Sequence, residues 1–319
     1  MALFLTEQDI KSLLTMPMAI EAVETVMAEV ARGEAVNMPR ERVRSRSTTQ
    51  HLLQGQVPSH QAIGYKVYTV SKGVVRFLLH VYDAGDGRLN GILEARLLGM
   101  MRTGAASGVA TKYLATRHAS VLGVFGSGRQ AVGQIEAVCQ VRPIKEVKVF
   151  SRNKDKLATF CHEMSARFGV TVRAAASAEE TVRDSDIITT ITSSDTPLFE
   201  GAWLKPGAHI NAAGANALSR REIDETALER CSLIVTDSRA VAEKECGDLL
   251  PLLEKGKLGW GQISELGDVI IGRAPARAAD DQITCYESHG LAVQDLIVGA
   301  RLLALARAGG IGVELPISI

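Results

Sequence analysis

Apolar and polar residues alternate with two different periods along the chain, and the change comes near residue 118. Beyond that point, short apolar runs alternate with longer stretches whose apolar residues recur every three or four positions. The runs are typical of buried parallel strands, and the stretches are typical of amphipathic helices. This alternation predicts a doubly wound parallel sheet of the Rossmann type. The predicted strands are 121–125, 146–151, 171–175, 186–191, 207–213 and 232–236, and the helices are 129–140, 154–168, 178–183 and 221–230.

The part of the chain before residue 94 follows a different plan. Thr6 followed by Asp9 is typical of a helix N-cap, and a second amphipathic helix is predicted from Pro17 to Gly33. After that helix the period shortens to two, which predicts strands over 40–47, 62–70, 75–82 and 88–93. The glycine-rich turn at 83–87 joins two of these strands, so we expect an antiparallel sheet in an α+β unit.

Two further helices are predicted outside this alternation, over 95–116 and 291–307. The first carries the run of small residues 104–108, which would let another backbone come close. The stretch 238–280 is expected to be mixed helix and loop.

The clearest motif lies where the strand predicted over 121–125 meets a glycine turn and a helix. In a dinucleotide-binding turn, the first glycine allows the tight bend and the second lets the backbone approach a pyrophosphate at the helix N-terminus. Ala131, at the third position, is small enough for close packing of the helix on the strand. We therefore favour dinucleotide binding over a plain turn, with contacts from Gly126, Ser127, Gly128, Arg129 and Gln130.

The end of the second strand of this unit bears on the choice of dinucleotide. NAD-preferring sites usually place a carboxylate there for the ribose 2′-hydroxyl. This strand ends in Ser151 and Arg152, and no carboxylate follows until Asp155. Ser151 and Arg152 could hold a 2′-phosphate, which favours NADP slightly. The alternative is that Arg152 stacks on the adenine ring, which is compatible with NAD.

Composition indicates a soluble globular protein with room for two domains. The chain has 319 residues, of which 46% are hydrophobic and 23% charged. Lys+Arg equal Asp+Glu at 36 each, so nothing indicates a nucleic-acid or strongly acidic partner. Charged residues interrupt the apolar C-terminal stretch, and residues 1–7 lack the features of a secretory signal. We expect a cytoplasmic protein that does not span a membrane.

The five cysteines are scattered through the sequence. They form no C-x-x-C pair and no metal-ligand spacing with the seven histidines. We therefore expect free thiols in a reducing compartment and no metal site.

Candidate substrate-binding groups come from the α+β unit rather than from the nucleotide fold. Arg40, Arg42 and Arg44 alternate along one predicted strand and so share a face, while Lys66 lies on the next strand. Arg102 follows on a helix. Guanidinium groups suit carboxylate binding, and a partly desolvated lysine suits acid–base catalysis. A solvated basic edge strand that prevents wrong sheet pairing would show the same spacing, so both interpretations remain open at this point.

The whole chain resembles the ornithine cyclodeaminase/μ-crystallin family of dinucleotide-dependent proteins. The motifs that carry the resemblance are spread over nearly its full length, and those at 102–104 and 211–214 are the most distinctive. The matching stretches are 39–42, 64–66, 101–105, 126–131, 209–214, 221–224, 288–290 and 294–296.

This resemblance implies a domain organisation and an assembly. The two ends of the chain, 1–117 and 293–319, would combine into a substrate-binding and dimerisation domain, and the dinucleotide-binding domain, 118–292, would be inserted between them. A homodimer joined through the antiparallel sheets is implied.

The resemblance also implies roles for individual residues. Arg42, Lys66 and Arg102 would match the family's carboxylate-binding and catalytic cations, with Arg42 chosen over Arg40 by its spacing to Lys66. Further residues would line the cofactor: the nicotinamide end would be lined by Thr103, Asn211, Gly214 and Ser288, and the sugar–phosphate path by Thr192.

One departure from the family pattern bears on the reaction. Cyclodeaminases place an aspartate just after the glycine at position 214, where it handles the water or amine of the deamination. This chain has Asn216 in that region, and an asparagine cannot exchange a proton at neutral pH, although it can orient a substrate. The substitution argues against ornithine cyclisation and leaves hydride transfer to a 2-imino acid as the simpler reaction.

The sequence therefore predicts an NAD(P)H-dependent reductase that converts a small 2-imino acid to an L-amino acid. Arg42 and Arg102 would bind the α-carboxylate, Lys66 would give the proton, and Asn216 would position the substrate. The additional arginines suggest a second carboxylate, so iminosuccinate is the first expected substrate and a cyclic ketimine is the second. The alternatives are a cyclodeaminase-type lyase and a non-enzymatic NADPH-dependent ligand binder.

Overall fold

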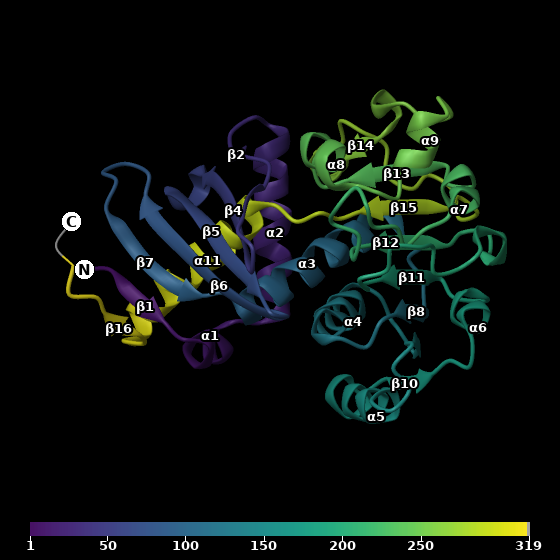
Figure 1. Cartoon of the computed structure of the whole chain (residues 1–319), viewed down its shortest axis with the longest axis horizontal. Coiled ribbons are helices and arrows are strands. Elements are labelled where there is room, and N and C mark those ends of the chain that lie inside the picture. Colours follow the sequence, from purple (N-terminus) through teal and green to yellow (C-terminus); the bar gives the residue numbers. More distant parts are fainter. Residues whose placement is uncertain (318–319) are drawn as a thin grey trace. The chain divides into compact units, whose positions relative to one another are not determined.

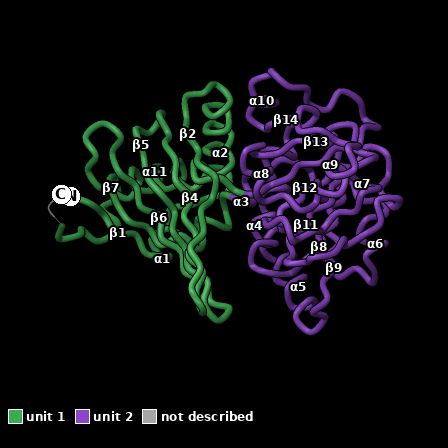
Figure 2. Tube along the Cα trace, turned by 45° about the horizontal axis from the view of Figure 1, so that its top comes forward, with its two compact units in different colours: residues 1–102, 290–319 green, residues 103–289 purple. Residues whose placement is uncertain are grey.

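The computed structural model of the protein describes residues 1–317, which form two compact units (Figure 2). Unit 1 combines residues 1–102 with the C-terminal segment that begins at Gly290, and unit 2 consists of residues 103–289. The limits predicted from the sequence, 117/118 and 292/293, differ from these mainly because the residues of one helix, α3 (Arg96–Leu114), are divided between the two units. The segment inserted between the two parts of unit 1 is thus a compact unit of its own.

Unit 1 is a sheet with helices on one face. α11 (Ala292–Gly309) packs across strands β4 to β7, and α2 (Met16–Ala31) lies beside it (Figure 1). α1 (Glu7–Leu13) opens with the predicted capping box, in which Thr6 and Asp9 each accept the other's backbone N–H. The strand order is β16 (Val313–Glu314), β1 (Leu3–Leu5), β7 (Leu89–Glu94), β6 (Val74–Asp83), β5 (Ala62–Ser71), β4 (Thr48–Val57) and β2 (Val36–Asn37), with β3 (Glu41–Arg44) also paired to β4.

The sequence did not predict β4, although this strand lies at the centre of the pairing between β3 and β5. Its period-two pattern is weakened by Gly55, where a side chain would collide with the carbonyl oxygen of Val36 on the neighbouring strand. The neighbouring pairs are antiparallel as predicted, except that β1 pairs with β7 in parallel.

Unit 2 contains a sheet in which all pairings are parallel, as the alternating pattern predicted. Helices cover both of its faces: Leu122 of β8 packs in the cluster with Ile135 of α4 (Arg129–Val141), whereas Phe125 packs in the opposite cluster with Leu228 of α7 (Glu225–Glu229). The strand order is β10 (Thr171–Ala174), β9 (Glu146–Phe150), β8 (Val121–Phe125), β11 (Ile187–Thr190), β12 (His209–Ala212), β15 (Thr284–Glu287), β13 (Leu233–Thr236) and β14 (Ser264–Glu265).

The predicted doubly wound class is confirmed. The sheet also contains β15, a strand that the sequence did not predict. This strand follows a long region of short helices and inserts between β12 and β13. The remaining helices of unit 2 are α5 (Leu157–Phe168), α6 (Ala178–Val182), α8 (Arg239–Glu245), α9 (Leu250–Glu254) and α10 (Leu266–Ile270). Among residues 1–317, no helix combines the length and the apolar character that crossing a bilayer requires.

Candidate active site

A buried group of opposite charges forms the polar centre of unit 1. The Asp295 carboxylate accepts hydrogen bonds from the Lys66 ammonium at 2.5 Å and from Nε of Arg102 at 3.0 Å. The Arg102 guanidinium also donates to Oε1 of Gln294 at 3.1 Å. Three segments far apart in the sequence therefore meet at one carboxylate.

The sheet register explains how Lys66 reaches this carboxylate. Lys66 lies opposite Leu53 on one side and Leu79 on the other. Leu79 packs against Gly299 of α11, so this row of the sheet faces the helix. Asp295 lies in the first turn of α11, where an acidic residue also favours the helix dipole. The carboxylate is fully buried and is compensated by two cations.

The same surroundings change the acidity of Lys66. Burial and, after it, the charge of the nearby Arg102 guanidinium lower the pKa of Lys66 to about 7, although Asp295 acts in the opposite direction. A lysine with a pKa near neutrality exists in both protonation states under physiological conditions. Such a group is suited to donate and accept a proton during a reaction.

Two arginines near Lys66 differ in their placement. Arg40 is 8% exposed, and its charge contributes to the lowered pKa of Lys66. Arg42 is half-buried and lies opposite His51 on β4. On β4, the partner of Arg42 therefore lies two residues from Leu53, the partner of Lys66. Arg40 precedes the first paired residue of β3.

Aromatic rings continue this face of the sheet beside Arg42. The rings of His51 and Tyr68 stack with centroids 4.2 Å apart, and Phe77 lies 5.1 Å beyond Tyr68. We call His51, Tyr68 and Phe77 the aromatic row. Burial lowers the pKa of His51 to about 4, helped by the charges of the arginines on β3 and just before it, so this imidazole is neutral at physiological pH.

Most of the residues predicted to bind a dinucleotide line one groove of unit 2. The groove has a volume of about 590 Å³ and lies at the carboxyl ends of β8, β9 and β11. In parallel sheets of this class, ligands bind at that edge. Most of the predicted residues line it, namely Gly126, Gly128, Arg129, Gln130, Ser151, Arg152 and Thr192, together with side chains such as Phe150, Asn153 and Ser194 that the sequence did not single out.

The glycine turn has the geometry that a nucleotide would need. Gly126 has φ of +110°, and a side chain there would approach the carbonyl oxygen of Ile191 to 2.8 Å. Gly128 is the N-cap of α4, whose first N–H groups have no partner within the helix. Oε1 of Gln130 is buried and has no hydrogen-bond partner among residues 1–317. The turn and the helix N-terminus fit a bound pyrophosphate, and the Gln130 oxygen, which is an acceptor, fits a donor such as a ribose hydroxyl.

Glu222 fixes two loops at this edge of the sheet. Its carboxylate accepts hydrogen bonds from the backbone N–H and hydroxyl of Thr192, at 2.6 and 2.5 Å, and from the N–H of Gly214 at 2.9 Å. Burial raises the pKa of Glu222 to about 7, although these donors favour the ionised form. No role was predicted for Glu222 from the sequence, yet it determines where two predicted cofactor-lining residues lie.

The other residues of unit 2 that the sequence predicted to act in the site lie outside the groove and differ in burial and in hydrogen-bond partners. Asn211 is fully buried, and its amide bonds to Thr111 at 3.0 Å and His209 at 3.2 Å. Asn216 is half-buried, and its side-chain oxygen accepts from Arg220 at 3.3 Å. None of the other predicted residues lines the groove, and this includes Gly214. Ser127 lies inside the glycine turn, the carbonyl oxygen of Thr103 accepts from Gln134, and Ser288 donates its backbone N–H to Ala212.

Comparison with known proteins places the chain among related dinucleotide-dependent proteins of one family. The sequence profile of the ornithine cyclodeaminase/mu-crystallin family matches residues 1–304. A Delta(1)-pyrroline-2-carboxylate reductase of Bacillus cereus is 36% identical over 260 residues, which cover 79% of this chain and 80% of the relative.

Two solved structures extend the likeness to the full chain. The Thermococcus litoralis Delta(1)-pyrroline-2-carboxylate reductase in complex with NADH and L-proline superposes with a TM-score of 0.94 at 31% identity, over 98% of this chain and 100% of the other. The iminosuccinate reductase of Paracoccus denitrificans in complex with NAD+ superposes with a TM-score of 0.93 at 28% identity, over 99% of both chains.

Proposed function

Since the chain belongs to the ornithine cyclodeaminase/mu-crystallin family, we propose that it is an NAD(P)H-dependent reductase of a small 2-imino acid. The product is the corresponding L-amino acid. The observation that carries this proposal is the buried group formed by Lys66, Arg102 and Asp295. Arg102 is a cation that can bind a carboxylate, and beside it Lys66 has a pKa of about 7.

Lys66 and Arg102 act directly in the proposed reaction. The reduced cofactor supplies a hydride to the imine carbon. Lys66 supplies a proton to the imine nitrogen, directly or through a water, so that the C=N bond becomes CH–NH. Arg102 binds the α-carboxylate together with Arg40 or Arg42, and Asn216 contributes a hydrogen bond that orients the substrate.

We propose that the groove of unit 2 binds the cofactor and accepts NADPH. No acidic side chain lines the groove in the described part of the chain, so the carboxylate that selects NAD is missing there. Ser151 and Arg152, directly after β9, provide a hydroxyl and a cation for a 2′-phosphate. NADH and NAD+ are the cofactors bound by the two similar structures, and the glycine turn suits either dinucleotide.

Two substrates are favoured by specific observations. The aromatic row provides an apolar wall for a ring, which supports a cyclic ketimine such as Δ1-pyrroline-2-carboxylate, the substrate in the name of the Bacillus relative. Arg42 lies beside that wall and could bind a second carboxylate, which supports iminosuccinate. The sequence ranked iminosuccinate first, whereas the aromatic row moves the cyclic ketimine ahead of it.

The experiment that tests this function is spectrophotometric oxidation of NADH and of NADPH with a panel of imino acids. We expect turnover with at least one cyclic or dicarboxylic imino acid, and NADPH to be used at least as well as NADH. A large preference for NADH would contradict the role given to Arg152. Release of ammonia from ornithine with catalytic NAD would identify a lyase instead, and tight cofactor binding without any turnover would identify a ligand binder.

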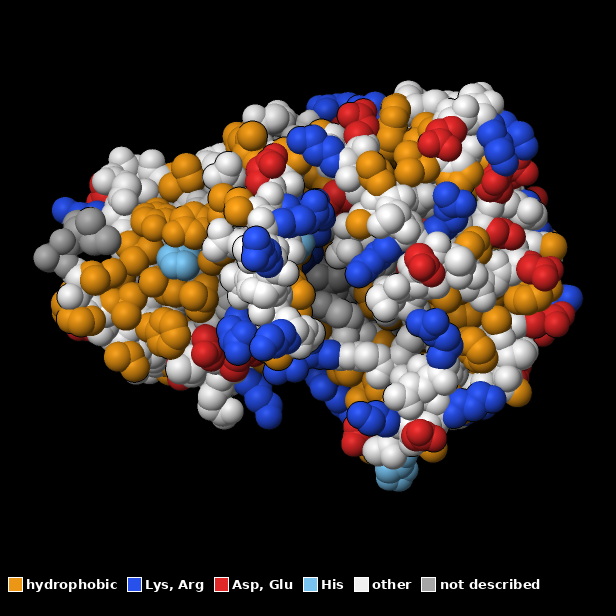
Figure 3. Space-filling view, viewed as in Figure 1, with side chains coloured by type: hydrophobic (Ala, Val, Ile, Leu, Met, Phe, Trp, Pro, Cys, Tyr) orange, Lys and Arg blue, Asp and Glu red, His pale blue; other side chains and the backbone are white. Residues whose placement is uncertain are grey.

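We propose that the protein is a homodimer joined through the sheet face opposite α11. That face carries exposed Ile63 (46%) and Leu78 (38%) and a stacked pair, Tyr65 and His80, with centroids 4.7 Å apart. Figure 3 shows hydrophobic side chains gathered over this sheet around a histidine. Exposed apolar faces of this kind are typical of protein interfaces. Static light scattering should give twice the monomer mass of 34.2 kDa, and a monomer mass would contradict the dimer.

A further inference from the structure

A second buried group of polar side chains lies in unit 2, and the proposed reduction does not use it. Cys246, at the C-cap of α8, lies beside Glu287, the last residue of β15, and His289, two positions further. One potential ligand atom from each residue lies within 4.8 Å of the others, and all three residues are at most 3% exposed. The sequence predicted no metal site because Cys246 is far along the chain from the other two residues.

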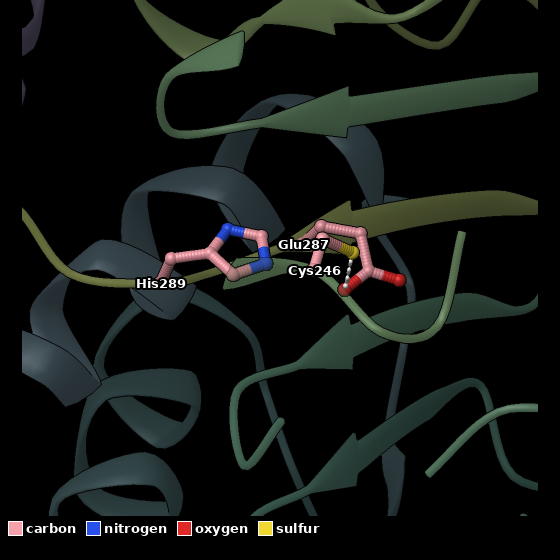
Figure 4. A group of neighbouring side chains, drawn as sticks. All are labelled: Cys246, Glu287 and His289. Carbon is pink, nitrogen blue, oxygen red and sulfur yellow. Dashed lines mark hydrogen bonds between the residues drawn. The ribbon is translucent and has the colours of Figure 1, made fainter. Parts of the chain in front are cut away.

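The three side chains point toward a common place (Figure 4). The thiol of Cys246 donates to the Glu287 carboxylate at 3.6 Å, and one ring nitrogen of His289 faces both groups. The other ring nitrogen, Nδ1, lies 3.5 Å from Oδ1 of Asp237, whose second oxygen accepts the His289 backbone N–H at 2.8 Å. A carboxylate behind a histidine is the arrangement that orients metal-binding imidazoles in proteins.

The charges around this group are predominantly negative. Asp237, Asp248 and Glu287 are each 1% exposed. Lys148 is the one almost fully buried lysine or arginine of unit 2 among the described residues, and its ammonium donates to the Arg183 carbonyl oxygen instead. The half-buried Arg221 is the cation whose charge acts on Asp248. Oδ2 of Asp248 is buried and has no hydrogen-bond partner within residues 1–317. Three buried carboxylates beside one half-buried arginine favour protonation or the binding of a further positive ion.

We propose that Cys246, Glu287 and His289 bind a divalent zinc ion. Thiolate, carboxylate and imidazole are the ligands that zinc prefers, and three protein ligands leave the fourth tetrahedral position to a water. The thiolate and the carboxylate carry two negative charges, which the ion neutralises. The ion joins the C-cap of α8 to the end of β15 and to His289, the last residue before the C-terminal segment of unit 1. Ser288, predicted to line the nicotinamide end, lies between two of the ligands.

The test uses the full chain without a histidine tag, dialysed against chelator and then incubated with zinc alone. Metal analysis after removal of free ion should find about one zinc per chain in the wild type and at most about a tenth of that in Cys246→Ala and His289→Ala. Cys285→Ala is the matched control, because its thiol is also buried and also donates to Glu287, at 3.7 Å, but is not one of the three ligands. This control should retain about one zinc per chain.

A second measurement begins with the wild type alone, so its first outcome does not depend on whether a variant folds. Cobalt(II) bound to the wild type should give the intense near-ultraviolet charge-transfer band of a thiolate ligand, and Cys246→Ser should lose that band. The proposal is overturned if the wild type retains no more zinc than Cys246→Ala, or if bound cobalt shows no thiolate band. Either result would mean that the group is a hydrogen-bonded cluster of protonated acids and thiols.

Discussion

Replacing Lys66 by methionine should lower kcat for imine reduction by about 10²- to 10⁴-fold, the range that a positioned general acid contributes. Methionine retains most of the length of lysine and suits the buried site, but it has no proton to give. The affinity for the cofactor should remain unchanged, because the glycine turn and groove proposed to hold it lie in unit 2. Steady-state kinetics and a cofactor-binding titration on the same sample separate the two effects.

Lys148→Met is the matched control for this substitution. Lys148 is also buried, at 7% exposure, but its ammonium donates to a backbone carbonyl oxygen in unit 2. Its replacement should leave the kcat of the folded enzyme within about a few-fold of the wild type, because Lys148 takes no part in the proposed reaction. Equal kcat values for Lys66→Met and the wild type would refute the role of Lys66 as proton donor.

The pH profile gives an independent check on this role. Lys66 must be protonated to act as an acid, and its pKa in the free protein is lowered to about 7. The value of kcat/KM for reduction should therefore be high below that pH and should fall as the pH rises through about 7. In Lys66→Met, kcat/KM should no longer fall at this pH. A profile that falls at the same pH in both proteins would assign the titration to another group or to the substrate.

The sequence predicted the fold of unit 2 well because its strands are buried on both faces and appear as short apolar runs. The strand at 121–125 was predicted at its observed limits. β4 was missed because one of its faces is polar and because Gly55 interrupts its pattern. The pairing of β15 between β12 and β13 depends on contacts between distant segments, which periodicity does not encode.

The candidate sites show a similar division. Four of the groove residues lie within one short stretch, 126–130, so a local motif was enough to find that part of the groove. Asp295 and Glu222 were not assigned roles, because each acts on residues far away in sequence. A signal for Asp295 was nevertheless present, since the one acidic residue of α11 lies in its apolar first half and must meet a cation when that part of the helix is buried. The partner of such a residue can be inferred only after the fold is known.

Replacing Asp295 by asparagine should produce a large loss of stability in unit 1. Asp295 is fully buried, and it is the carboxylate that binds both Lys66 and Arg102. Asparagine fills the same space but leaves two buried cations without their counter-charge. Breaking a buried ion pair in this way costs about 3–5 kcal/mol, which is a large part of the roughly 5–15 kcal/mol that stabilises a folded domain. Urea denaturation should show the loss as a lower midpoint.

Asp268→Asn provides the matched control, because Asp268 also binds one arginine, Arg273 at 3.0 Å, but at the surface. Its replacement should cost less than about 1 kcal/mol, since water screens an exposed pair. The role of Asp295 in the site adds a second readout. Asp295 raises the pKa of Lys66, so its neutralisation should move the fall in kcat/KM to lower pH. Unchanged stability and an unchanged pH profile in Asp295→Asn would show that this carboxylate neither compensates the two cations nor tunes the lysine.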